Sequence, residues 1–216
     1  MTYITYFCVY FTILLVSSIF GMVNFKKLTV PFKILTLFLT YTFISEIVAR
    51  VFALRFRNSS PVYHMFVIAN YYFYTAIFYQ LLRGSIIRKV VIWTIIPFSC
   101  FWMINILFFQ HINSFPSYSL MVACTLFIVY SLALFMQMLE TPTEIAIFKQ
   151  NIFWFNISAL FYSVVLVAFF SISSYMVKHN ISNIPIDTVV DVITAINYAL
   201  LGFTIIADKR QSVKTA

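Results

Sequence analysis

Seven apolar runs divide the chain, and each is close in length to a membrane-spanning helix. They cover residues 3 to 23, 34 to 55, 64 to 82, 90 to 109, 118 to 139, 152 to 176 and 186 to 207. About twenty helical residues cross the hydrocarbon core of a bilayer. The run that begins near Ser119 is apolar on every face, which favours a helix over the alternating strands of a β-barrel. The sequence therefore predicts an all-α, polytopic membrane protein with seven transmembrane helices.

The composition agrees with this class. The chain is 62% hydrophobic and 9% charged, whereas a soluble domain is about one quarter charged. Too few residues remain between the runs for a soluble domain, so we expect residues 1–216 to form one seven-helix transmembrane domain. The net charge of +8 lies in short loops rather than in a basic stripe, so we expect no nucleic-acid partner.

Loops that follow one another along the chain lie on opposite sides of the membrane, and Lys and Arg are distributed unevenly between the two sides. One side holds Lys26, Lys27, Lys33, Arg83, Arg88, Lys89, Lys149, Lys209, Arg210 and Lys214; the other holds Arg55, Arg57 and Lys178, with Arg50 inside a span. Cytoplasmic loops carry the excess of Lys and Arg. We therefore expect the N-terminus outside and the C-terminus in the cytoplasm. The expected membrane is a bacterial inner (plasma) membrane.

Two local signals refine the helices. Pro97 is the proline that falls in the middle of a span, so we expect a kink in the fourth helix. Thr141, Pro142 and Glu144 form a capping pattern. This pattern predicts a short helix along the membrane surface after the fifth span.

Ionisable residues inside a membrane are costly and are functional candidates. In the second span Glu46 and Arg50 are four residues apart and can neutralise each other. In the seventh span Asp187, Asp191, Thr194 and Tyr198 fall on one face. With Asn70 and Asn105, all these groups except Thr194 and Tyr198 map to the outer half of the membrane. We therefore predict an outward-facing polar cavity above an aromatic core, with the ligand-binding residues Glu46, Arg50, Asn70, Asn105, Asp187, Asp191, Thr194 and Tyr198.

Structural interpretations of the same residues stay open. Glu46 and Arg50 can pair only to offset desolvation, and Asp187 can be an N-cap. Asp191 has no basic neighbour in its own helix and is the hardest to explain structurally. Asn156 is typical of helix-helix contacts. The histidines lack zinc-site spacing, so we expect no metal and no cofactor.

Three stretches carry a resemblance to known proteins. They read PVYHMFVIANYYFYTAIFYQLL from residue 61, YSLMVACTLFIVYSLALFMQMLE from 118 and NIFWFNISALFYSVVLVAFFSISSY from 151, followed by a helix with Asn197. In this order they resemble small seven-helix integral membrane proteins of Bacteroidota, and they are similar to the membrane region of some sensor histidine kinases. The resemblance implies a sensory role. Because the chain ends nine residues after Ala207, we expect a separate partner to carry any output.

The sequence alone is consistent with three functions. The first is a sensory or interaction module that binds a small or lipidic ligand in the outward-facing cavity and signals to a separate cytoplasmic or membrane partner. The alternatives are an intramembrane lipid-acting hydrolase that uses Asp191 or Glu46, similar to lysoplasmalogenase-like enzymes, and a small solute transporter. Membrane lipids are expected partners in each case. The sequence permits a homo-oligomer without deciding it.

Overall fold

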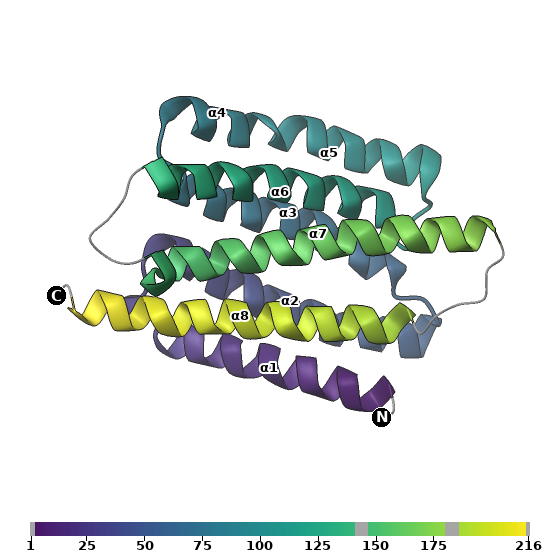
Figure 1. The fold of residues 1–216 in the computed structure, drawn as a ribbon. Helices are drawn as coiled ribbons and strands as arrows, with labels where there is room; N and C mark the ends of the chain where they lie inside the picture. The colour runs from purple at the N-terminus through teal and green to yellow at the C-terminus, as the bar shows by residue number, and fades with distance from the viewer. Residues whose placement is uncertain (1–2, 141–146, 180–185, 215–216) are drawn as a thin grey trace.

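The computed structural model describes residues 3–140, 147–179 and 186–214, with the side chains of 3–7, 85, 174, 177, 178, 186–189 and 210–214 left out. Every regular element in this part of the chain is helical (Figure 1). The elements are α1 (Tyr3–Val23), η1 (Phe25–Lys27), α2 (Val30–Phe56), α3 (Ser60–Leu81), α4 (Ser85–Trp93), α5 (Ile95–Ile104), η2 (Asn105–Phe109), α6 (Ser117–Glu140), η3 (Ile147–Lys149), α7 (Asn151–Lys178) and α8 (Ile186–Lys214). The predicted all-α class is confirmed.

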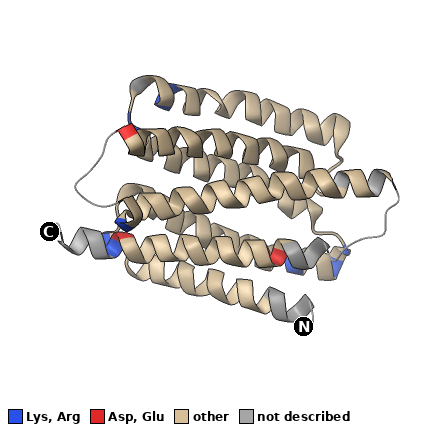
Figure 2. Cartoon of the chain, viewed as in Figure 1, with Lys and Arg blue, Asp and Glu red and all other residues tan. Residues whose placement is uncertain are grey.

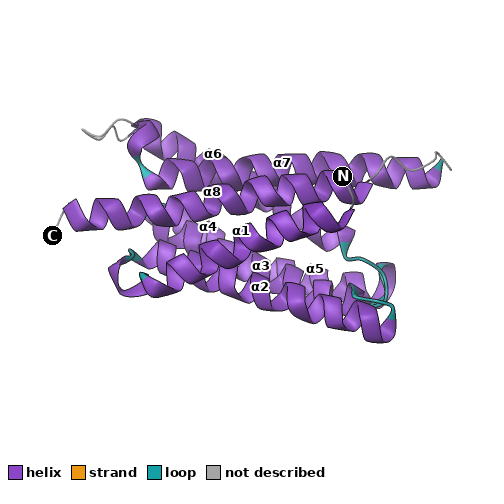
Figure 3. Cartoon of the chain, turned by 90° about the horizontal axis from the view of Figure 1, so that it is seen from below, coloured by secondary structure: helices purple, strands orange, loops and turns teal. Residues whose placement is uncertain are grey.

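Six of the helices form a ring. Following the contacts between neighbours, α1 packs on α2, α2 on α3, α3 on α6, α6 on α7, α7 on α8, and α8 again on α1. The helices α4 and α5 stand outside this ring and pack against α3 and α6, along one edge of the view in Figure 1. Figure 3 shows the same helices side by side after a quarter turn. The first and last helices are therefore neighbours, and they close the ring.

Among the described residues, the charged ones lie toward the two ends of the bundle, and the middle of the cartoon holds none (Figure 2). We call the end where α1, α3, α6 and α8 finish the basic end; its described basic residues are Lys26, Lys27, Lys33, Arg83, Arg88, Lys89, Lys149 and Lys209. The other end carries Arg50, Arg55 and Arg57, and we call it the arginine end. The long sides between them are almost entirely apolar.

Five helical stretches of the described chain are long and apolar enough to cross a membrane. They are Val30–Phe56, Ile86–Phe109, Ser117–Glu140, Asn151–Ser173 and Val190–Lys209. Their outward-facing side chains include Phe108, 76% exposed, and Leu139, 70% exposed. Large apolar groups in such numbers on the outside of a bundle need a hydrocarbon solvent. The structure is therefore that of a membrane protein.

The fourth apolar run is interrupted twice. Helix α4 ends at Trp93 and α5 begins at Ile95, two residues before Pro97, whose missing N–H cannot bond to the carbonyl of Trp93. Helix α5 then passes into the π-helical turn η2 at Asn105. The surface helix expected from Thr141 to Glu144 lies outside the described residues.

Close contacts hold α1 in the ring. A Cβ on Gly202 of α8 would overlap the side chain of Ser17, and a Cβ on Gly21 would come within 2.6 Å of the Thr36 Cγ2 of α2. Small residues at such positions let helices approach closely in membranes, where van der Waals packing replaces the hydrophobic effect. Helix α1 is thereby packed tightly against both α2 and α8.

Candidate functional site

The ring of helices encloses a cavity of about 360 Å³ in the half of the bundle nearest the arginine end. All six ring helices contribute to its wall, together with the loop before α6. The lining residues are Tyr10, Phe38, Glu46, Tyr63, Phe66, Val67, Asn70, Tyr74, Phe115, Leu120, Tyr162, Leu166, Phe169, Phe170, Val190, Asp191, Thr194, Asn197 and Tyr198. This volume and this mixed lining are typical of sites for small molecules.

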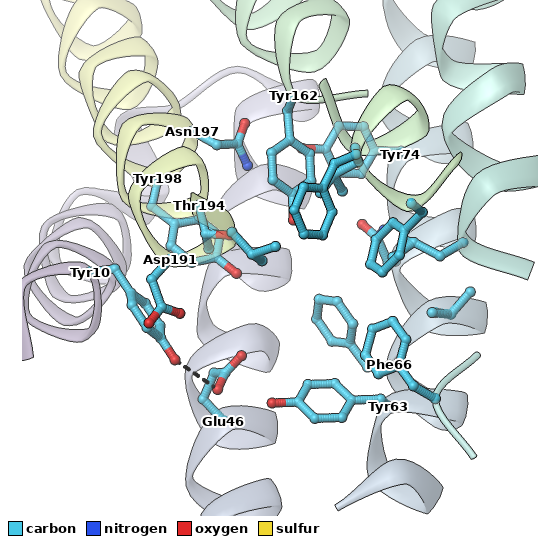
Figure 4. A pocket seen from close by; sticks show the side chains of 18 of the residues that line it. Tyr10, Glu46, Tyr63, Phe66, Tyr74, Tyr162, Asp191, Thr194, Asn197 and Tyr198 are labelled. Atoms are coloured by element: carbon cyan, nitrogen blue, oxygen red, sulfur yellow. Dashed lines mark hydrogen bonds between the residues drawn. The ribbon is translucent and has the colours of Figure 1, made fainter. Parts of the chain in front are cut away.

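Two carboxylates from different helices meet on one side of the cavity. Glu46 of α2 accepts a hydrogen bond of 3.2 Å from the Tyr10 hydroxyl of α1. Asp191 of α8 lies close enough to interact electrostatically with Glu46. Figure 4 shows both carboxylates together, with the Tyr63 hydroxyl of α3 pointing toward Glu46. This acidic corner joins four helices.

Arg50 lies beside the acidic corner rather than on the cavity wall. Its position one turn after Glu46 on α2 places it where it interacts electrostatically with both Glu46 and Tyr10. It is not among the residues that line the cavity. Arg50 therefore compensates part of the negative charge of the acidic corner without lining the cavity, whereas both carboxylates line it.

One face of α8 forms a polar wall. Asp191, Thr194 and Tyr198 all line the cavity, because steps of three and four residues return to the same side of a helix. Thr194 interacts with the Tyr162 hydroxyl of α7. The Tyr198 side chain is 4% exposed, and its ring lies 6.4 Å from that of Tyr10. The wall thus offers one carboxylate and several hydroxyl groups.

Aromatic side chains close the cavity on the side of the basic end. Tyr74 packs edge-on against Phe38, with ring centroids 5.3 Å apart, and stacks on Phe127 at 4.7 Å. Beyond them Tyr71 stacks on Phe98 at 3.7 Å. The Tyr74 hydroxyl is buried without a hydrogen-bond partner of good geometry in the described structure, although the Asn197 side chain lies nearby. A polar atom is thus available at the deep end.

Of the eight residues proposed from the sequence, five line the cavity: Glu46, Asn70, Asp191, Thr194 and Tyr198. Asn105 lies elsewhere, because it begins η2, which continues α5 outside the ring; its amide donates to the Ser119 Oγ at 3.0 Å and to Gln110. The backbone of Asp187 belongs to the first turn of α8, and its side chain is outside the described residues. Position along the helices alone therefore does not say which side chains face the cavity, because that depends on how the helices pack.

Several lining residues were not identified from the sequence, among them Tyr10, Tyr63, Tyr162 and Asn197. Asn197 had a usable signal, since it follows Thr194 by three residues on the polar face of α8. The tyrosines had none, because they sit among many aromatic residues with similar spacing. Tyrosine in an apolar helix is equally suited to packing and to hydrogen bonding.

Other buried polar groups join helices rather than line the cavity. Asn156 of α7 donates to the Ser131 carbonyl at 2.9 Å, and the Ser158 Oγ donates to the Asn197 Oδ1 at 2.8 Å. Such bonds are the usual role of amides between transmembrane helices. His64, fully buried, places its Nε2 2.9 Å from the Ser114 carbonyl oxygen. In the described part of the chain, no three His, Cys, Asp or Glu side chains come together as a metal site.

A fully buried carboxylate lies at the basic end. Asp208 of α8, 1% exposed, accepts hydrogen bonds from the Thr29 N–H at 2.8 Å and the Thr29 hydroxyl at 3.0 Å. It also accepts one from the Asn151 Nδ2 at 2.6 Å. Thr29 precedes α2 and Asn151 begins α7. Asp208 therefore ties the starts of two helices to the last turns of a third.

Comparison with known proteins gives no match, whether with family models, with curated proteins or with solved structures. The resemblance to seven-helix proteins of Bacteroidota and to sensor-kinase membrane regions thus stays an expectation from the sequence.

Proposed function

We propose that this protein is a membrane-embedded binding module that takes up a small or lipidic ligand in the cavity and passes a helix displacement to a separate partner. The observation that carries this proposal is the cavity itself, which six helices enclose with two carboxylates on its wall. A void of this size lined by polar groups is costly unless something fills it.

The proposed arrangement in the membrane has seven spans, with the fourth formed by α4, α5 and η2 together. Helices α1 and α3 add to the five strongly apolar stretches. The excess of Lys and Arg at the basic end supports a cytoplasmic location for that end. Exposed Trp93 at that end, and exposed Tyr118 and Tyr175 at the other, fit the two interfacial aromatic belts. In this orientation the cavity lies in the outer half of a membrane such as a bacterial inner membrane.

Helix α8 is the proposed path between ligand and partner. It contributes Asp191, Thr194 and Tyr198 to the cavity, and about 25 Å along the helix from Asp191 it carries Asp208, which holds the starts of α2 and α7. A ligand that shifts the first half of α8 changes the position of the Asp208 cluster. The partner is accordingly expected at the basic end.

A lipid-acting hydrolase is the second candidate, because two acidic side chains on the same cavity wall can divide the roles of acid and base. This candidate requires turnover, whereas the binding module requires only retention. Incubating the purified protein with lysolipids and diacyl lipids and measuring free head groups and fatty acids separates the two.

The binding proposal is tested by native mass spectrometry of the protein released from a mild detergent. We expect the wild type to carry a bound small molecule that Thr194→Phe, which fills the cavity, excludes. Ala199→Phe is the matched control, because Ala199 is on the exposed side of the same helix. A wild type without bound molecules, whether from native membranes or after incubation with membrane extract, would contradict the proposal.

The orientation is tested separately. A periplasmic reporter fused before Thr2 should be active, and the same reporter fused after Ala216 should be inactive. The reverse pattern would place the cavity in the inner half of the membrane.

A further inference from the structure

The charged residues on the cavity wall are all acidic. Among the described lining residues, Glu46 and Asp191 are the ones with carboxyl groups and none is Lys, Arg or His, whereas Arg50, which interacts with Glu46, does not line the cavity. Two carboxylates near each other repel, and a low dielectric strengthens that repulsion. A cation between them relieves it, whereas an anion at the same place adds to it. With two carboxyl groups on the wall against one arginine beside it, the site favours a positively charged ligand over a negatively charged one.

The acidic corner is surrounded by aromatic rings. Figure 4 shows Tyr10 on one side of Glu46 and Tyr63 on the other, with Phe66 next to Tyr63. The rings of Tyr162 and Tyr198 line the same cavity. The negative faces of such rings attract ammonium groups, and quaternary ammonium ligands are commonly held in aromatic surroundings of this kind. The rings and the carboxylates thus favour the same ligand charge.

The rest of the wall is apolar. Leu120, Leu166 and Phe169 offer no polar side-chain atoms, and together they provide contact for a hydrocarbon chain or ring. The Tyr74 hydroxyl, on a side chain that is 3% exposed, is the deep polar atom without a bonded partner in the described structure. A fitting ligand is therefore amphipathic.

From this geometry we propose that the ligand is an organic cation, an amine or a quaternary ammonium group attached to a short apolar chain or ring, with its charge between Glu46 and Asp191. The inference rests on the proposed function, since it names the class of ligand for the same cavity. A free amine and the choline head group of a lipid share this chemistry.

The test compares four probes with the same six-carbon chain: hexyltrimethylammonium, hexylphosphocholine, hexanol and hexanesulfonate. Binding is measured by calorimetry and by thermal shift on the full chain in an uncharged maltoside detergent. We expect hexyltrimethylammonium to bind at least about tenfold more tightly than hexanol, and hexanesulfonate not to bind. Hexylphosphocholine that binds as well as hexyltrimethylammonium would identify the source of the cation as a lipid head group.

Variants connect this selectivity to the two carboxylates. Glu46→Gln and Asp191→Asn should each remove the preference for the cation, while Glu140→Gln, an exposed acid at the basic end, should retain it. Wild type that binds hexanol or hexanesulfonate as tightly as the ammonium probe, or that binds none of the four, would overturn the inference. If the probe series fails in this way but native mass spectrometry still finds a bound molecule, the proposed function stands and only the cation inference is wrong. If native mass spectrometry finds no bound molecule either, both the inference and the proposed function are wrong. The wild-type probe series decides even if a variant fails to fold.

Discussion

Two acidic sites, one toward each end of the bundle, use their carboxylates differently. Asp208 accepts three hydrogen bonds from Thr29 and Asn151 within a closed contact between helices. Glu46 and Asp191 instead face a cavity of about 360 Å³. A carboxylate surrounded by protein donors fixes the helices that supply them. Carboxylates on a cavity wall remain accessible to a ligand, so we assign stability to the first site and recognition to the second.

The largest effect on stability is expected at Asp208. Asp208→Ala removes the acceptor for the Thr29 N–H at the start of α2 and for Asn151, and it leaves the buried Asn151 amide without this partner. We expect the free energy of unfolding to fall by about 3 kcal/mol, measured by SDS titration in mixed micelles. Asp208→Asn keeps one oxygen acceptor and should lose about half as much. An unchanged free energy for Asp208→Ala would contradict a structural role for this site.

The second prediction concerns the helix that joins the two sites. Gly202 lies on α8 between Asp191 and Asp208, and a Cβ there would overlap Ser17 of α1. Gly202→Leu should therefore separate α1 from α8 and lower the free energy of unfolding by about 2 kcal/mol. Ala199→Leu, on the exposed side of α8, is the matched control and should be nearly neutral. Equal effects of both substitutions would mean that the α1–α8 contact is not tight.

The difference between the two sites also marks how far the sequence predicts this structure. Hydrophobic length alone placed seven helical segments, and Pro97 marked the break in the fourth. Asp208 was not identified, because the seventh apolar run ends at Ala207 and the residues that bind Asp208 are 179 and 57 positions away in the chain. Long-range hydrogen bonds of this kind leave no periodic trace in a sequence.

Some of the residues that line the cavity could be predicted from the sequence, because the periodicity within one helix shows which residues share a face. A periodic face on α8 and four-residue spacing on α2 placed Asp191, Thr194 and Glu46 correctly on inward-facing stripes. Asn105 has a similar depth, but α5 packs outside the ring. The tyrosines that complete the wall are set by how six helices pack together, and no single helix contains that information. The sequence thus predicts which residues share one face of a helix, whereas the packing of the helices decides which of these faces line the same cavity.

A smaller effect is expected for Glu46 of the acidic corner and its neighbour Arg50. Glu46→Gln should destabilise the protein, because Arg50 loses its neighbouring carboxylate, and adding Arg50→Gln should restore part of the loss. We expect a coupling of about 1 kcal/mol from the double-mutant cycle. Glu46→Gln combined with Arg88→Gln at the basic end should be additive. Additivity in the first cycle as well would show that Glu46 and Arg50 do not interact directly.

The smallest effect on stability, and the sharpest contrast with Asp208, is expected for Asp191→Asn. The amide keeps the volume of the carboxyl group and its hydrogen-bonding capacity, and it removes one of two like charges on the cavity wall. We therefore expect a change of less than about 1 kcal/mol in the free energy of unfolding, together with loss of hexyltrimethylammonium binding. Asp208→Asn should give the opposite pair of results, lower stability with binding retained by the protein that remains folded.

Measuring both properties on both variants in the same detergent decides between recognition and structure for each carboxylate. If Asp191→Asn unfolds the protein, Asp191 belongs with Asp208 as a structural group, and the comparison between the two ends fails. If Asp191→Asn folds and still binds the ammonium probe as the wild type does, the cavity does not recognise charge through Asp191. Stability retained together with binding lost is the result that ties the charge of Asp191 to the ligand, because the substitution changes little besides that charge.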